Sequence, residues 1–400
     1  MGDNKKIIPD LLIRALLGKL QEKNLLDTPG VEAAFRAVPR HLFLPDVSIQ
    51  DAYEDRAIPI KRDAGGLVIS SASQPTMMAI MLQQLQLKPG ENVLEIGTAT
   101  GYNAAIMQHI VGEQGHVTSI ELDKDLADQA RKNLQSAGYE GVRVVQADGV
   151  RGYAQRAAYD VIIATVGIHD VPPAWLSQLK QGARLVVPIW LDGVQVSALF
   201  HKTPDGSWLS EQNNPCAFVY LRGDSATSVQ QLRVGTAGLQ LLADNVRRLD
   251  PISLHTLLSD DHSVSNLSNR LSESDYWYGF QLYIMLNTPD KYTFAIYAVL
   301  SESRAYGLEG RGIALFSPAG AVFAPYQDRG VLQSYAGSDA TLLMQSMFDD
   351  WEAAGRPGVP QLRLQLIPMT DTAPEIESGR LFRRIDHYLH VWMDTVDDND

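Results

Sequence analysis

The fold is decided by the stretch Val93–Tyr102, which reads Val-Leu-Glu-Ile-Gly-Thr-Ala-Thr-Gly-Tyr. Its apolar beginning predicts a short buried strand, and the pattern that follows predicts a helix over 102–111. A glycine-containing loop joins the two. Gly97 permits a sharp turn at the end of the strand, and Gly101 permits a ligand to approach the backbone closely. In open α/β sheets, ligands bind at the carboxyl ends of the strands, where this loop lies.

Strands and helices alternate around this stretch. The strands are expected at 92–96, 115–121, 142–146, 159–165, 184–188, 194–201 and 217–221. The helices are expected at 77–87, 102–111, 126–137 and 172–179, after a helical segment over 10–45. This alternation predicts a Rossmann-like α/β fold with a mostly parallel sheet.

A second, smaller domain is expected at the C-terminal end. Residues 224–231 are polar and lack a period, so we place the boundary there, with one domain over 1–223 and another over 224–400. The second domain has a strand pair at 312–316 and 321–323 and an amphipathic helix near 341–354. These features predict an α+β domain.

Acidic residues end the next two strands. Glu121 stands roughly where a ribose-binding acid follows such a loop, and its carboxylate could accept hydrogen bonds from both ribose hydroxyls. Asp148, followed by Gly149, could accept a hydrogen bond from an adenine amino group. Each acid alone could simply be solvated at a strand end, but the loop and both acids together favour a nucleoside-containing cofactor. A nicotinamide dehydrogenase is disfavoured because the loop lacks the third glycine of Gly-x-Gly-x-x-Gly.

The same stretch resembles the first cofactor motif of the protein-L-isoaspartate O-methyltransferases, which are class I S-adenosylmethionine-dependent enzymes. Other segments resemble the family in the same order, over residues 10–222: 38–45, 53–55, 73–75, 159–162, 172–179, 182–188 and 218–221. The resemblance implies that S-adenosylmethionine is held by Glu95, Gly97, Thr98, Ala99, Gly101, Tyr102, Glu121, Asp148 and Gly149. Within the first strand, Glu95 is expected to orient the loop and to approach the amino-acid end of the cofactor.

Ser73, in Ser-Gln-Pro, matches the active-site serine motif of the family. The resemblance implies that Ser73 lies beside the methyl group and the acceptor carboxylate. Alternatively, Ser73 caps the N-terminus of the helix that follows Pro75.

The sequence departs from the family at two places. Ala99 stands where the family usually has glycine, which predicts a displaced or stiffer loop. Residues 65–71 differ from the tighter approach to the serine in the family, so the preference for one acceptor does not follow from the resemblance.

The implied activity is methylation of an aspartate or isoaspartate carboxylate in a peptide or protein. The domain order, with patches at 348–351 and 355–357, is similar to methyltransferases of ribosomal-peptide maturation. This favours an aspartate in a ribosomally made modified peptide, whose ester can close to a succinimide. One alternative is general repair of isoaspartyl damage, with the C-terminal domain as an oligomerisation module through which a homodimer forms. Another is a non-catalytic, peptide-binding protein, which Ser73, Glu121 and Asp148 disfavour.

Composition narrows the partners further. The net charge of −13 argues against bulk binding to nucleic acid or to acidic membranes. A single cysteine, Cys216, and a polar N-terminus without an apolar leader pattern predict a cytoplasmic protein. The histidines lack metal-ligand spacing, and methyl transfer from a sulfonium requires no metal, so none is expected.

Overall fold

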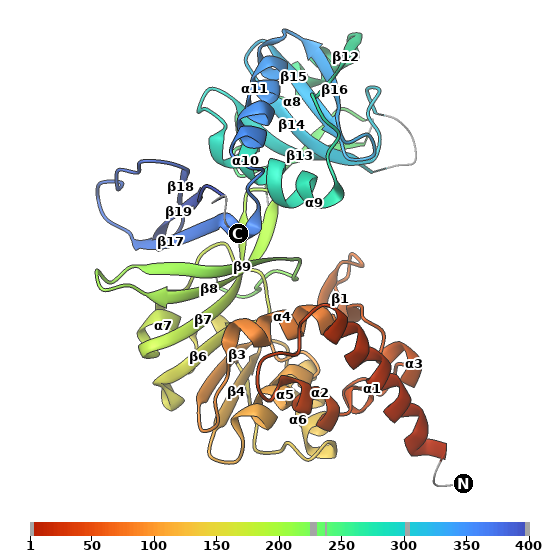
Figure 1. Ribbon diagram of the computed structural model, residues 1–400, viewed down its shortest axis with the longest axis vertical. Helices are drawn as coiled ribbons and strands as arrows, with labels where there is room; N and C mark the ends of the chain where they lie inside the picture. Colours follow the sequence, from red (N-terminus) through yellow and green to blue (C-terminus); the bar gives the residue numbers. More distant parts are fainter. Residues whose placement is uncertain (1–3, 225–229, 237, 301–304, 397–400) are drawn as a thin grey trace. The chain divides into compact units, whose positions relative to one another are not determined.

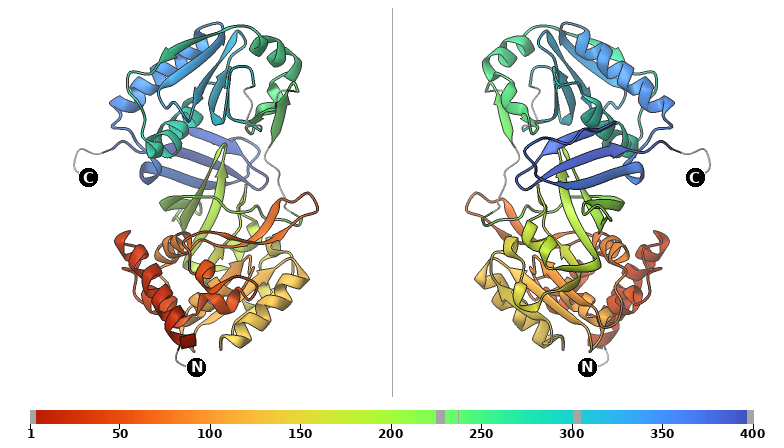
Figure 2. Two further views of the ribbon diagram at one scale, coloured as in Figure 1. Left: turned by 90° about the vertical axis from the view of Figure 1, so that its right-hand side faces the viewer. Right: turned by 90° about the vertical axis from the view of Figure 1, so that its left-hand side faces the viewer.

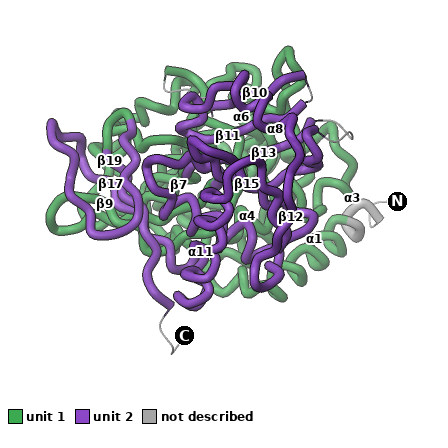
Figure 3. The backbone as a smooth tube through the Cα atoms, turned by 90° about the horizontal axis from the view of Figure 1, so that it is seen from above, with its two compact units in different colours: residues 1–189, 195–227, 385–387 green, residues 190–194, 228–384, 388–400 purple. Residues whose placement is uncertain are grey.

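The computed structural model describes residues 4–224, 230–236, 238–300 and 305–396 (Figure 1). The chain forms two compact units, shown in two colours in Figure 3. Unit 1 consists of residues 1–189, 195–227 and 385–387, and unit 2 of residues 190–194, 228–384 and 388–400. The predicted domain boundary directly precedes residues 225–229, which lie outside the described residues, so its position stays a prediction.

Unit 1 begins with short helices and a hairpin. These elements are α1 (Asn4–Glu22), α2 (Val31–Ala37), a 3-10 turn (Arg40–Phe43), α3 (Ile49–Ala52), β1 (Ile58–Arg62), β2 (Val68–Ala72) and α4 (Pro75–Leu85). Strands β1 and β2 pair antiparallel. Helix α2 packs against α5 (Tyr102–Val111), and the red N-terminal segment lies beside α5 in Figure 1 and beside the orange segment that contains α5 in Figure 2.

The central part of unit 1 alternates as the sequence predicts. Its elements are β3 (Asn92–Ile96), α5 (Tyr102–Val111), β4 (His116–Glu121), α6 (Lys124–Ser136), β5 (Arg143–Gln146), β6 (Tyr159–Ala164), α7 (Pro173–Ser177), β7 (Leu179–Leu191), β8 (Val194–Lys202) and β9 (Trp208–Cys216). Within the unit the strand order is β9-β8-β7-β6-β3-β4-β5, and the pairs among β3 to β7 are parallel. The predicted Rossmann-like, mostly parallel sheet is confirmed.

One predicted strand is wrong. Residues 217–221 form no strand of the sheet; only an isolated bridge joins Tyr220 to Gly167. The last antiparallel strand is instead β9, which pairs with β8. Residues 219–221 of this run line the cavity described below, and an apolar run alone does not distinguish a strand from a cavity wall.

Unit 2 is an α+β structure around an antiparallel sheet. The strands of this sheet are β10 (Gln231–Val234), β11 (Leu239–Leu242), β12 (His262–Asn266), β13 (Thr293–Val299), β14 (Arg311–Phe316), β15 (Gly320–Pro325) and β16 (Val331–Ala336). Its helices are α8 (Pro251–Ser259), α9 (Glu273–Asp275), α10 (Gln281–Asn287) and α11 (Asp339–Ala353). The predicted strand pair is confirmed as the β14–β15 hairpin, and α11 packs against it.

Three further strands of unit 2 follow α11: β17 (Leu362–Pro368), β18 (Arg380–Arg383) and β19 (His387–Met393). The large aromatic side chains of the unit are mostly internal: Trp351 is buried against Phe280 and Phe348. Across the described part of the chain, no helix is both long enough and apolar enough to span a bilayer.

Candidate active site

The loop between β3 and α5 requires glycine at its first position. Gly97 has a φ of 103°, and a Cβ atom added there would lie 2.6 Å from Oγ1 of Thr165. The Thr165 hydroxyl lies in the turn after β6 and donates to the carbonyl of Gly97 at 2.7 Å. Gly101, with a φ of 86°, is the N-cap of α5. Glycine is therefore required at Gly97 because a side chain would collide with the turn after β6, and the backbone of Gly97 lines the cavity described below.

Ala99 shows what the departure from glycine does. Its φ is 47°, a left-handed conformation that a residue with a Cβ adopts at a cost of order 1 kcal/mol. Its N–H donates to Oε2 of Glu121 at 2.9 Å, which holds the loop in this conformation. A displaced or stiffer loop, relative to the family, stays a prediction.

Glu121 lies at the end of β4 and lines the cavity. Its side chain is nearly buried, and burial raises the pKa of its carboxyl. Each oxygen accepts one backbone hydrogen bond, Oε2 from Ala99 and Oε1 from Asp123 at 3.2 Å. A carboxylate oxygen can accept two hydrogen bonds, so both retain capacity for a ligand hydroxyl.

Glu95 lies behind the cavity rather than on its surface. It is fully buried, and it accepts hydrogen bonds from Oγ of Ser119 at 2.5 Å and from Nδ2 of Asn103 at 2.8 Å. Burial raises the pKa of Glu95 to about 7. Among the described residues, Asn103 lines the cavity and Glu95 does not. Glu95 thus orients Asn103, and it is Asn103 that can reach a ligand.

The carboxylate of Asp148 binds backbone N–H groups of the protein itself. Its carboxylate accepts from the backbone N–H of Val150 at 3.0 Å and of Asp224 at 2.7 Å. We call residues 219–224 the closing segment. Its Arg222 pairs with Asp123, just beyond β4, at 2.8 Å, so the segment is fixed at the ends of two successive strands. Gly149 lines the cavity, whereas the predicted contact of Asp148 with adenine stays a prediction.

Ser73 lies between β2 and α4 and lines the cavity. The alternative that it caps α4 is wrong: the N-cap residue is Gln74, without a side-chain cap, and Thr76 N–H is bound instead by Oδ1 of Asp55 at 2.9 Å. Within the described residues, no hydrogen-bond partner is seen for the Ser73 hydroxyl. It is therefore available to a ligand.

Sequence reasoning missed Arg40, which lay unremarked inside the segment 38–45. Its side chain is fully buried, with Nε donating to the carbonyl of Ala52 at 2.8 Å and Nη2 to the carbonyl of Ser73 at 2.9 Å. The guanidinium lies 5.1 Å from the centre of the Tyr102 ring. A charged residue inside an otherwise apolar run is the signal that could have identified it.

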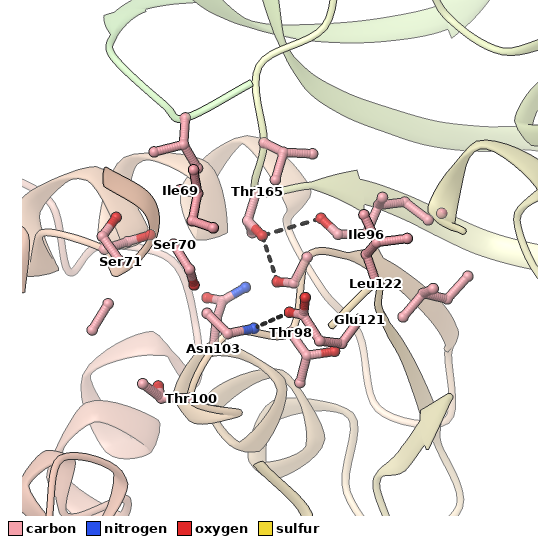
Figure 4. A pocket seen from close by; sticks show the side chains of 18 of the residues that line it. Ile69, Ser70, Ser71, Ile96, Thr98, Thr100, Asn103, Glu121, Leu122 and Thr165 are labelled. Atoms are coloured by element: carbon pink, nitrogen blue, oxygen red, sulfur yellow. Dashed lines mark hydrogen bonds between the residues drawn. The ribbon is translucent and has the colours of Figure 1, made fainter. Parts of the chain in front are cut away.

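These elements enclose one cavity (Figure 4), with Ser70 and Ser71 on one side and Glu121 and Leu122 on the other. Its lining residues are Arg40, Ile69, Ser70, Ser71, Ala72, Ser73, Met78, Ile96, Gly97, Thr98, Ala99, Thr100, Tyr102, Asn103, Ile120, Glu121, Leu122, Gly149, Thr165, Val166, Val219, Tyr220, Leu221 and Arg222. Six of the nine predicted cofactor residues line it, together with Ser73. The exceptions are Glu95, Gly101 and Asp148.

The donor set fits S-adenosylmethionine. Gly97 lines the cavity without a side chain, which suits a ligand that passes close to the backbone, and the carboxylate of Glu121 suits a ribose diol. Asn103 offers amide hydrogen-bonding capacity near the loop.

Comparison with known proteins identifies the family. The sequence model of the protein-L-isoaspartate(D-aspartate) O-methyltransferase family matches residues 13–226. The protein-L-isoaspartate O-methyltransferase of Hyperthermus butylicus is 40% identical over 219 residues, covering 53% of this chain and 88% of that protein. The protein of the same name from Ignicoccus hospitalis is 40% identical over 209 residues, covering 52% of this chain and 96% of that protein.

A solved structure of a protein-L-isoaspartate O-methyltransferase has a similar fold over 95% of this chain and 99% of its own, with a TM-score of 0.52 and 23% identity. With the family match over more than half of the chain, the loop and Glu121 in place and a cavity that fits the cofactor, the chain belongs to the protein-L-isoaspartate(D-aspartate) O-methyltransferase family and is an S-adenosylmethionine-dependent protein carboxyl O-methyltransferase.

Proposed function

We propose that this enzyme methylates the free carboxylate of L-isoaspartyl residues in peptides and proteins. The observation that carries the proposal is the unpartnered hydroxyl of Ser73 on the wall of the cofactor cavity, next to the buried cation of Arg40. A hydroxyl donor and a positive charge are complementary to a carboxylate acceptor. The names of the relatives, which match this chain over most of their own length, support the same substrate.

The chain's own groups perform binding and positioning. When bound, S-adenosylmethionine supplies an electrophilic methyl group. The backbone at Gly97 and the carboxylate of Glu121 would hold the cofactor, and Asn103 would offer its amide beside them. The Ser73 hydroxyl donates to one oxygen of the acceptor carboxylate, which leaves the other oxygen free to react. The acceptor is already an anion at neutral pH, so no general base is needed and alignment supplies most of the rate.

Maturation of a ribosomally made peptide is the second candidate. The observation in its favour is the bulk of unit 2, residues 228–384 and 388–400, which lies beyond the family match over residues 13–226. However, the similar solved structure covers 95% of this chain and is itself an isoaspartate methyltransferase, so a two-unit layout also suits isoaspartyl repair. We assign unit 2 a role in peptide selection or self-association, with repair as the primary activity.

Two peptides of one sequence test the proposal, one with aspartate and one with isoaspartate at the same position. We expect methyl transfer to the isoaspartyl peptide and little to the aspartyl peptide, measured with labelled S-adenosylmethionine. Several unrelated isoaspartyl sequences should be accepted. Methylation of the aspartyl form, or acceptance of only one sequence context, would favour maturation over repair.

A further inference from the structure

Arg40 is a buried cation without a matching anion. Its side chain has no exposed surface. In the described part of the chain, its hydrogen-bond acceptors are two backbone carbonyls and the Met78 sulfur at 3.6 Å, and none carries a charge. A buried charge is costly unless it is paired, and proteins usually provide a partner.

Asp55 is the carboxylate whose charge acts on Arg40, and it already has other hydrogen-bonding partners. Asp55 contributes to the electrostatic environment of Arg40, but its carboxylate accepts from Lys23 at 3.1 Å and from the hydroxyl of Thr76 at 2.6 Å. Burial lowers the pKa of Arg40, but an arginine side chain keeps its charge in proteins. The positive charge is therefore incompletely compensated.

Arg40 also fixes the residue that meets the acceptor. Its Nη2 holds the carbonyl of Ser73, and its guanidinium lies over the ring of Tyr102, at the start of α5. Both of these residues line the cavity. The Arg40 side chain thus both supplies the positive charge and fixes the position of Ser73.

We infer that Arg40 is the positioning residue that selects a negatively charged acceptor, both by holding Ser73 and by supplying the charge that the acceptor carboxylate complements. The inference rests on the proposed function. Because the guanidinium attracts the carboxylate before reaction, the effect belongs to acceptor binding and appears in KM more than in kcat. The methyl ester is neutral, so the same charge does not retain the product.

The test compares an isoaspartyl peptide with its isoasparaginyl analogue, in which an amide of similar shape replaces the carboxylate. Calorimetry with S-adenosylhomocysteine present gives the Kd of each peptide. The full-length variants are Arg40→Met, which removes the charge, and Arg40→Lys, which retains it. Arg143→Met, at an exposed arginine of β5, is the matched control.

We expect the wild type and Arg143→Met to prefer the carboxylate peptide. In Arg40→Met this preference should fall by about tenfold or more, with S-adenosylhomocysteine affinity nearly unchanged, whereas Arg40→Lys should keep most of it. A purely structural role would weaken both peptides equally. If Arg40→Met binds S-adenosylhomocysteine normally and keeps the full preference, the inference is wrong.

If Arg40→Met does not fold, the peptide affinities of Arg40→Lys and the wild type test the inference. Loss of the preference in a folded Arg40→Lys, or equal binding of both peptides by the wild type, contradicts selection by charge. If the wild type binds no carboxylate peptide, the proposed function fails and the inference with it. If the wild type and the Arg40 variants bind the carboxylate peptide with the same preference over the amide peptide, the role of Arg40 is wrong but the proposed function stands.

Discussion

The two ends of the cavity, which we propose hold the cofactor and the acceptor, are built differently. The cofactor end comes from consecutive strand ends: the loop after β3 and Glu121 after β4 lie within 25 residues of each other in sequence, from Gly97 to Glu121. The acceptor end combines Arg40, the segment before α4 and the closing segment, which are far apart in the chain. The cofactor end is thus set by local backbone geometry, and the acceptor end by tertiary hydrogen bonds. Substitutions at the first end should therefore change cofactor affinity, and substitutions at the second end should change methyl transfer to the acceptor.

The largest effect is expected from Gly97→Ala. The added Cβ would meet Thr165 Oγ1 at 2.6 Å in a left-handed backbone conformation, so the loop must shift. We expect affinity for S-adenosylhomocysteine to fall at least about a hundredfold, on the order of 3 kcal/mol. Titration calorimetry measures this. Near-normal affinity in a folded protein would mean that backbone shape does not define the cofactor end.

Ser73→Ala should affect only the acceptor end. Its hydroxyl makes no hydrogen bond with the described residues, so the melting temperature and the affinity for S-adenosylhomocysteine should be unchanged. Loss of one hydrogen bond to a charged acceptor should lower kcat/KM for an isoaspartyl peptide by roughly 10- to 100-fold. Unaltered turnover would remove Ser73 from the acceptor site.

Glu95→Gln should give the smallest effect, seen in the pH dependence of stability. Burial raises the pKa of Glu95 from 4.5 to about 7, so the folded state binds the proton more tightly than the unfolded state. The stability from this proton is complete below pH 4.5 and is lost as the pH rises toward 7. Melting temperatures across this range should decline less in Glu95→Gln than in the wild type. Parallel profiles would show that Glu95 does not titrate there.

The comparison also explains what the sequence could predict. The loop, Glu121 and the parallel sheet follow from local patterns, because glycine turns and strand-end acids have a fixed place in such folds. Arg40 could not be placed, because its partners Ala52 and Ser73 meet it only in the folded chain. Asp148 was predicted at the correct strand end, but its bond to Asp224 depends on a segment 76 residues later.

The hairpin β1–β2 was missed for a related reason. Its residues alternate poorly, and Pro59 interrupts the first strand, so the strand pattern is weak. The hairpin nevertheless brings Ile69, Ser70 and Ser71 to the cavity wall. The hairpin contains residues 65–71, where the sequence departs from the family, so part of that departure lies on the cavity wall.

The closing segment has a consequence for chain entropy. Arg222 and Asp224 fasten it beside β4 and β5, and the family match ends at residue 226, immediately beyond it. At its other end, Gly167 N–H donates to the carbonyl of Val219 and Leu221 N–H donates to the carbonyl of Gly167, each at 2.8 Å, so the segment is anchored at both ends within unit 1. A loop with fixed ends has fewer conformations to lose when it becomes ordered. These anchors therefore lower the entropic cost of ordering the segment over a bound ligand.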